Sequence, residues 1–215
     1  GGALFSKDEH LLRKSSDFIS RLPAPTLGDE ISHILVTYIR SNLRSRPLWG
    51  FVGTKIWAAY NKRTDFVDKS PIVQGRMFAS NLELVRRRMP YLDSMVSKQR
   101  IHAKYYEDHL RVDPEMLCME PPGYYLNRFM FPIVFPSTRI RNAVAGHLKR
   151  YGIDSSRPYE EAIKGTAREY GYKGDCPTAE RLLRNTLVLP SYYRLSLSTV
   201  ERIAHRVNEA WLSFR

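Results

Sequence analysis

The sequence predicts an α/β chain, more closely an α+β chain, in which several helices pack around a small sheet. Apolar residues recur at helical spacing over most of the 215 residues, and one segment, Tyr125 to Phe135, alternates as a strand does. A hydrophobic content of 43% and a charged content of 26% are those of an ordinary globular protein. This length allows one sizeable core or two smaller ones.

The first part of the chain is predicted to be mainly helical. Ala3–Leu4–Phe5 resembles the end of a short strand, and a helix then begins at Asp8–Glu9 and ends before Pro23. Leu27 to Leu43 predicts a second helix with an apolar face, which Pro47 stops. Because this half has few strands of its own, we expect it to pack on a body outside these residues.

A segment rich in aromatic residues, Trp49 to Tyr60, is predicted to be helical or irregular, and Thr64 to Ser70 to be a turn. Packing against another domain explains the aromatic residues better than a membrane surface, because the segment lacks a strongly basic face. The longest apolar stretch, Leu48 to Tyr60, is shorter than the ~20 residues that a membrane span needs. Arg76 to Leu110 then predicts a long helical stretch that Pro90 kinks or divides.

The next part of the chain combines a loop, a strand and a helix. Pro121–Pro122–Gly123 predicts the loop, and the strand from Tyr125 to Phe135 follows it. Ser137 to Tyr151 predicts an amphipathic helix, with Gly152 at the position where a glycine commonly ends a helix. A helix directly after a strand indicates a compact α+β unit.

Two more helices are predicted near the C-terminus. Pro177 to Asn185 forms a short one and is followed by the apolar run Leu187 to Pro190. The last helix is predicted to begin at Ser198, because Glu201 lies three residues further on, as in a capping box.

Charge is the most unusual bulk property, because 34 Lys and Arg against 22 Asp and Glu give a net charge of +12. Either a phosphate-bearing partner or a basic solvated surface explains it. A basic nucleic-acid-binding module is the less favoured alternative, since the cations are scattered and Arg86–Arg87–Arg88 is their only tight run. The two cysteines, Cys118 and Cys176, form no C-x-x-C pair, which fits a reduced, cytoplasmic setting.

No self-sufficient active site is evident in the sequence alone. The six histidines do not follow a metal-binding spacing, and the paired acids Glu160–Glu161 are interpreted as an exposed face. No phosphate-binding glycine motif or nucleophile elbow is present. The sequence therefore predicts no metal site.

A series of short motifs follows one order along the chain. Gly1–Gly2 opens it, Arg76–Met77 and Leu92–Asp93 lead to Arg100–Tyr106, and later landmarks run from Phe131–Pro132–Ile133 to the Leu189–Tyr192 segment. In this order and spacing the chain resembles the C-terminal portion of DegT/StrS sugar aminotransferases, which depend on pyridoxal 5′-phosphate (PLP). In that family the Schiff-base lysine lies just before the glycine pair, so it is expected upstream of residue 1.

The resemblance implies the C-terminal portion of a transferase of the aspartate-aminotransferase type. Residues 1–75 would be the remaining edge of the large PLP domain and a helical connection, residues 76–120 the long linking helices, and residues 121–215 the small α/β domain. It also implies a homodimer that works in polysaccharide biosynthesis, with a nucleotide-diphosphate sugar and an amino-acid donor, usually glutamate, as substrates. PLP is expected in the full-length family and not on this chain alone.

Four site residues follow from the same resemblance. The family amide that reaches the PLP phosphate across the dimer falls on Gln74, one methylene longer than the usual asparagine, and Arg76 is the neighbouring candidate. Tyr159 and Lys164 fall near the substrate sugar, Lys164 in place of a family histidine. These departures leave two hypotheses: an aminotransferase of nucleotide-linked keto-sugars, or a catalytically inactive relative that serves as an assembly domain.

Overall fold

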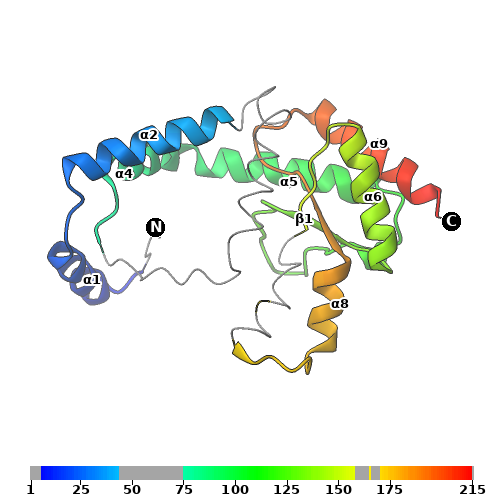
Figure 1. Ribbon diagram of the computed structural model, residues 1–215, viewed down its shortest axis with the longest axis horizontal. Helices are drawn as coiled ribbons and strands as arrows, with labels where there is room; N and C mark the ends of the chain where they lie inside the picture. The colour runs from blue at the N-terminus through cyan, green and yellow to red at the C-terminus, as the bar shows by residue number, and fades with distance from the viewer. Residues whose placement is uncertain (1–5, 44–74, 158–164, 166–169, 215) are drawn as a thin grey trace. The chain divides into compact units, whose positions relative to one another are not determined.

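The computed structural model describes residues 6–43, 75–157, 165 and 170–214. The chain divides into two compact units, Gly1–Pro90 and Tyr91–Arg215, which are described one at a time. The strand expected at Ala3–Leu4–Phe5 and the segments 49–60 and 64–70 lie outside the described residues. The described residues confirm the predicted class, in which helices pack with a small sheet (Figure 1).

The first unit contains α1 (Glu9–Arg21), α2 (Leu27–Leu43) and α4 (Ala79–Arg88), so both predicted N-terminal helices are confirmed. Asp8 caps α1 by accepting hydrogen bonds from the backbone N–H groups of His10 and Leu11. Thr26 and Asp29 bond reciprocally to each other's backbone N–H at the start of α2, as in a capping box.

Apolar side chains of this unit remain exposed. Neither α1 nor α4 contains a buried residue. On α2 the large apolar side chains are at least half exposed at Leu27, Ile31, Ile34, Leu35, Tyr38 and Ile39. An apolar helix face of this kind is typical of a surface that further protein covers, and the packing of this half on another body stays a prediction.

The long helical stretch predicted from Arg76 to Leu110 is two helices. Pro90 lies in a short 3₁₀ turn, η2 (Met89–Tyr91), between α4 and α5 (Leu92–His109). The predicted division at Pro90 is therefore confirmed. The predicted start is wrong by three residues, because residues 75–78 are non-helical and α4 begins at Ala79.

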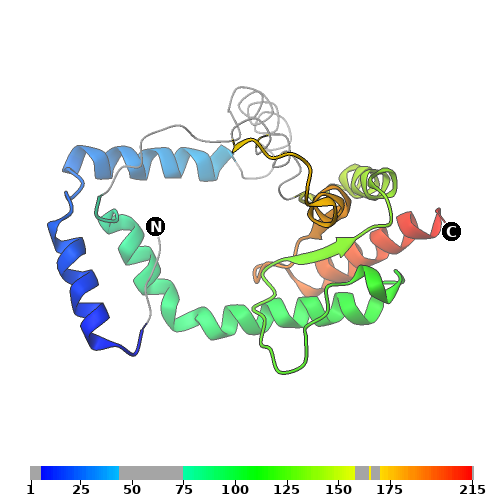
Figure 2. The ribbon, with the colours of Figure 1, turned by 90° about the horizontal axis from the view of Figure 1, so that it is seen from below.

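The second unit is built on a two-stranded antiparallel sheet of β1 (Phe131–Val134) and β2 (Thr186–Leu189). Phe131 pairs with Leu189, and Val134 pairs with Thr186. The helices of this unit are α5, α6 (Thr138–Arg150), α8 (Pro177–Asn185) and α9 (Leu197–Leu212), with a 3₁₀ turn, η3 (Pro114–Met116), after α5. Helices α5 and α9 lie side by side, and α6 also packs on α9 (Figure 2).

One hydrophobic core fills this unit. The three helices α5, α6 and α9 and both strands contribute to it, and its most deeply buried members are Tyr106, Phe131, Ile133, Phe135, Val144, Leu148, Leu187, Leu189, Val200, Ile203 and Val207. Alternate residues of β1, Phe131 and Ile133, face the core, as the alternating pattern predicts. The apolar run before Pro190 is the second strand because its residues bury themselves against the same core.

Two predicted boundaries in this unit are wrong. The strand expected from Tyr125 begins only at Phe131, because Arg128 has φ +54°, a left-handed conformation that a strand cannot contain. The last helix is capped by Ser196 and not by Ser198, since the Ser196 hydroxyl accepts from the backbone N–H of Thr199. The predicted helix after Ser137 is confirmed, and Gly152 follows it with φ +69°.

Candidate functional site

Three of the four predicted site residues, Gln74, Tyr159 and Lys164, lie outside the described residues, so their roles stay predictions. Arg76 is described, and its side chain lies at the C-terminal end of α1. Its Nε donates to the carbonyl of Leu22 at 3.1 Å, and its Nη2 donates to the carbonyl of Ser20. Its backbone N–H also donates to the carbonyl of Pro23 at 2.9 Å.

The last carbonyls of a helix have no partner within the helix, and they carry the negative end of the helix dipole. A guanidinium at this end both satisfies carbonyls and complements the charge. Arg76 therefore caps α1 from a position more than 50 residues away in sequence. This geometry makes Arg76 a helix cap, and its role at the cofactor phosphate stays a prediction.

A second charged side chain, Glu30 of α2, holds the start of α4, as Arg76 holds the end of α1. The Glu30 carboxylate, from α2, accepts from the backbone N–H of Ala79 and, at 3.1 Å, from the hydroxyl of Ser80. Ala79 is the first residue of α4, where a carboxylate complements the positive end of the dipole. His33, one turn further along α2, stacks on the ring of Phe78 with centroids 4.1 Å apart.

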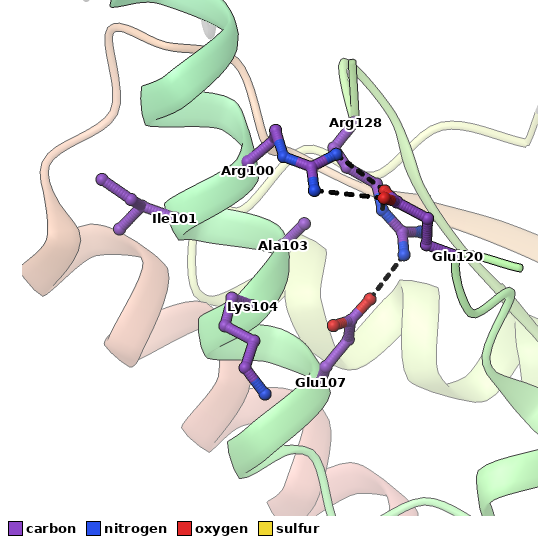
Figure 3. A pocket seen from close by; sticks show the side chains of 7 residues that line it. All are labelled: Arg100, Ile101, Ala103, Lys104, Glu107, Glu120 and Arg128. Carbon is purple, nitrogen blue, oxygen red and sulfur yellow. Dashed lines mark hydrogen bonds and ion pairs between the residues drawn. The ribbon is translucent and has the colours of Figure 1, made fainter. Parts of the chain in front are cut away.

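The second unit contains an open pocket of about 440 Å³ on α5. Arg100, Lys104 and Glu107 reach it from α5, and Glu120 and Arg128 reach it from the loop that follows η3 (Figure 3). The two arginines converge on the carboxylate of Glu120 (Figure 3).

Arg128 is the most deeply enclosed of these charges, with 7% of its side chain exposed. Its Nη2 donates to Glu107 Oε1 at 2.7 Å, and its Nη1 donates to the Cys118 carbonyl at 2.8 Å. Its Nε lies 3.7 Å from Glu120 Oε2. These partners, together with the Ser191 hydroxyl on its carbonyl oxygen at 3.0 Å, hold the left-handed backbone of Arg128 in place.

Arg100 binds Glu120 through both oxygens, at 2.7 and 3.1 Å, and it also donates to the carbonyl of Leu126. This bidentate contact with Arg100 lowers the pKa of Glu120, and Glu120 in turn raises the pKa of Arg100. Glu120 therefore stays ionised at neutral pH. The guanidinium of Arg100 also lies over the ring of Tyr125, 4.1 Å from its centroid.

Residues of α5 also hold the chain segment that leaves β2. The hydroxyl of Tyr106 donates to the Pro190 carbonyl at 2.7 Å, and His102 Nδ1 lies 3.3 Å from the Ser191 carbonyl. Burial raises the pKa of Tyr106, so this phenol stays neutral and remains a donor. The Pro190–Ser191 segment is thus tied both to α5 and to Arg128.

The arrangement favours binding or positioning over proton transfer. The pocket's carboxylates are paired with guanidinium groups, and the two cations nearest solvent are Arg100 and Lys104. Among the described residues, no three His, Cys, Asp or Glu side chains are placed to hold a metal ion. None of the helices that the structure describes is long and apolar enough to cross a membrane.

Sequence reasoning did not identify this charged cluster. Arg100 belongs to the family motif, whereas no local pattern marks Glu107, Glu120 or Arg128 as site residues. Arg128 was expected on one face of a strand. No pattern in the sequence connects these residues, since the pairs join positions 20 and 21 residues apart.

The model of the DegT/DnrJ/EryC1/StrS aminotransferase family matches residues 54–208. Among curated proteins, none matches this chain. Among solved structures, the aminotransferase TlmJ from Streptoalloteichus hindustanus is similar at 25% identity and a TM-score of 0.50, over 62% of this chain and 35% of TlmJ.

Two further structures share the fold. Spr1654 from Streptococcus pneumoniae, in its PMP form, matches at 17% identity and a TM-score of 0.57, over 69% of this chain and 40% of its own. Helicobacter pylori PseC, an aminotransferase involved in the biosynthesis of pseudoaminic acid, matches at 19% identity and a TM-score of 0.52, over 70% of this chain and 43% of its own. The chain thus spans less than half the length of these three proteins.

Proposed function

Since the chain belongs to the DegT/DnrJ/EryC1/StrS aminotransferase family, we propose that it is part of a PLP-dependent enzyme that aminates nucleotide-linked keto-sugars. The family match carries this proposal, because it runs through α4, both strands and most of α9. The likeness to the aminotransferase TlmJ supports it. PseC, which is involved in the biosynthesis of pseudoaminic acid, supports a sugar as the substrate class.

PLP, when bound, supplies an electron sink and a carrier for the amino group. The PMP form of Spr1654 supports this cofactor. In the proposal the Schiff-base lysine belongs to a segment outside these 215 residues, since the chain spans only 35% of TlmJ. Gln74 would donate its amide to the PLP phosphate across a homodimer.

Tyr159 and Lys164 would contact the substrate, Lys164 through the diphosphate of the nucleotide sugar. The net charge of +12 supports an anionic substrate of this kind. Glutamate is the proposed amino donor, and the cytoplasm the proposed compartment.

The test uses the longest protein that contains these residues, purified with PLP. Supplied with L-glutamate and a panel of nucleotide-linked keto-sugars, it should release 2-oxoglutarate and one amino sugar, both detected by mass spectrometry. Lys164→Ala should raise KM for the nucleotide sugar more than for glutamate, while Lys173→Ala, the nearest lysine in the following segment, serves as the matched control. A protein that forms no amino sugar from any member of the panel contradicts the proposed activity.

An inactive relative that serves as an assembly domain is the second candidate. The exposed apolar face of α2 favours it, because that face needs covering protein whether or not catalysis occurs. Light scattering on the purified chain distinguishes the outcomes: this candidate predicts stable assembly without aminotransferase activity in the longest protein. A chain that stays monomeric and captures no partner would exclude it.

A further inference from the structure

The pocket on α5 is built on one face of that helix. Arg100, Ala103, Lys104 and Glu107 are three or four residues apart, the spacing that places side chains on one side of a helix. Ala103 is the short member of this set, and the longer side chains project around it (Figure 3). The pocket volume of about 440 Å³ lies within the range typical of small-molecule sites.

Glu107 presents an acceptor to this pocket. Its Oε1 accepts from Arg128 at 2.7 Å, and no residue in the described part of the chain donates to its Oε2. Figure 3 shows this second oxygen pointing away from Arg128, toward the side of the pocket where Lys104 lies. Only 13% of the Glu107 side chain is exposed. A carboxylate oxygen so enclosed favours a ligand that brings a hydrogen-bond donor to it.

Lys104 and Arg100 present donors to the same pocket. Lys104 pairs with Asp108 at 2.6 Å, but the two side chains are 68% and 46% exposed, and an exposed pair of this kind contributes little stability. Lys104 is therefore able to exchange Asp108 for a ligand at small cost. Arg100 uses three of its five N–H groups on Glu120 and the Leu126 carbonyl, and the other two have no partner among the described residues.

The charges that line the pocket do not cancel. Three cations, Arg100, Lys104 and Arg128, stand against the two carboxylates of Glu107 and Glu120. Arg128 pairs with Glu107, and Arg100 pairs with Glu120, so the excess positive charge is that of Lys104. A ligand that matches this lining carries a net negative charge and also a donor group for Glu107.

We infer that this pocket binds a small acidic amino acid, whose ammonium group donates to Glu107 Oε2 and whose carboxylates accept from Lys104 and Arg100. The contacts of Arg100 with Glu120 and with the ring of Tyr125 already fix its guanidinium, so its free edge is preorganised for a carboxylate. This inference goes beyond the proposed function and does not depend on it, because all the lining residues lie in the second unit.

The experiment measures binding by isothermal titration calorimetry to the longest protein that contains these residues, prepared without PLP. The probes are L-aspartate, succinate, which lacks the ammonium group, and β-alanine, which lacks one carboxylate. The variants are Lys104→Gln and Glu107→Gln, and the exposed residues Lys98 and Glu115 supply the matched controls Lys98→Gln and Glu115→Gln. Glu107→Gln keeps a carbonyl oxygen that accepts from Arg128, and its urea midpoint checks that it folds.

The wild-type protein should bind L-aspartate about fivefold to tenfold more tightly than succinate or β-alanine, because each of these lacks one charge-assisted contact. Lys104→Gln should weaken the binding of both L-aspartate and succinate by about fivefold to tenfold. Glu107→Gln should remove the preference for L-aspartate over succinate, since its amide N–H₂ group does not accept from an ammonium group. The two control variants should match wild type.

Several results would overturn the inference. A wild-type protein that gives no saturable heat with any of the three probes lacks the site. Equal affinity for L-aspartate and succinate in wild type contradicts the role of Glu107, and this comparison holds even if Glu107→Gln fails to fold. An unchanged Kd in Lys104→Gln would mean that the amino acid binds elsewhere. Equal weakening by Lys98→Gln and Lys104→Gln would mean a general attraction to the basic surface.

Discussion

The guanidinium of Arg128 and the carboxylate of Glu107 form an ion pair at 2.7 Å, with only 7% and 13% of the two side chains exposed. Arg128 makes this contact from a left-handed backbone conformation at φ +54°. Strain of this kind typically costs about 1–3 kcal/mol and persists only where surrounding contacts hold it. The pair therefore anchors the loop before β1 to α5.

Arg128→Met should destabilise the protein by about 3 kcal/mol, because it leaves Glu107 enclosed without its cation. Urea unfolding followed by circular dichroism measures the change. Lys104→Met is the control on the same helix, since Lys104 pairs with Asp108 at the exposed surface and should cost less than about 1 kcal/mol. The double variant Arg128→Met/Glu107→Leu should recover part of the lost stability. Equal losses of stability in Arg128→Met and Lys104→Met would contradict this account.

The pair of Arg100 and Glu120 should make stability depend on pH in the acid range. Arg100 lowers the pKa of Glu120, so the pair contributes its full stability above the ordinary glutamate pKa of 4.5 and loses it as pH falls through the lowered value. The difference in urea midpoint between wild type and Glu120→Gln should therefore be constant from pH 7 to pH 5 and shrink below pH 4. A difference that grows on acidification would have the wrong sign.

The two serines before α9 should differ in importance. Ser196→Ala removes the hydroxyl that caps the Thr199 N–H and should lower stability by about 1 kcal/mol. Ser198→Ala is the matched control two residues later, and it should not lower stability by more than about 0.5 kcal/mol, because Ser198 lies inside the helix, where alanine is the better helix former. Thermal unfolding midpoints of the two variants decide between them. If Ser198→Ala lowered the midpoint more than Ser196→Ala, the N-cap would be Ser198, as the sequence predicts.

Tyr106→Phe isolates one buried hydrogen bond. The change keeps the ring against Phe131 but leaves the Pro190 carbonyl without its donor, at a cost of about 1 kcal/mol. Hydrogen exchange should also rise in the segment after β2, which this bond ties to α5. Tyr124→Phe, at an exposed tyrosine, should change neither quantity. An unchanged unfolding midpoint in Tyr106→Phe would mean that the bond contributes nothing.

Local sequence signals predicted the helices well. The apolar spacing and the flanking Asp8, Ser137 and Gly152 act within one or two turns, so they can be interpreted without the rest of the fold. The start of β1 could not be predicted in this way. Its alternating pattern extends back through Arg128, and contacts with Glu107, Cys118 and Ser191, which lie 21, 10 and 63 residues away, hold that residue outside the strand.

The candidate sites depend still more on distant contacts. Arg76 was identified from a family motif, but its role as a cap depends on carbonyls 54 and 56 residues away. The same holds for Glu30, whose carboxylate accepts a hydrogen bond from the first backbone N–H of a helix 49 residues later. A side chain's charge is evident in the sequence, whereas its partner depends on which helix ends the fold brings together.

The sequence by itself determined the mixed class, the helices and the family, because these depend on local periodicity and on the order of motifs along the chain. Tertiary structure decided where β1 begins, which serine caps α9, and which charges pair. The physical reason is that ion pairs and helix caps act over about 3 Å between groups far apart in sequence. Such contacts exist only where the fold brings the elements together.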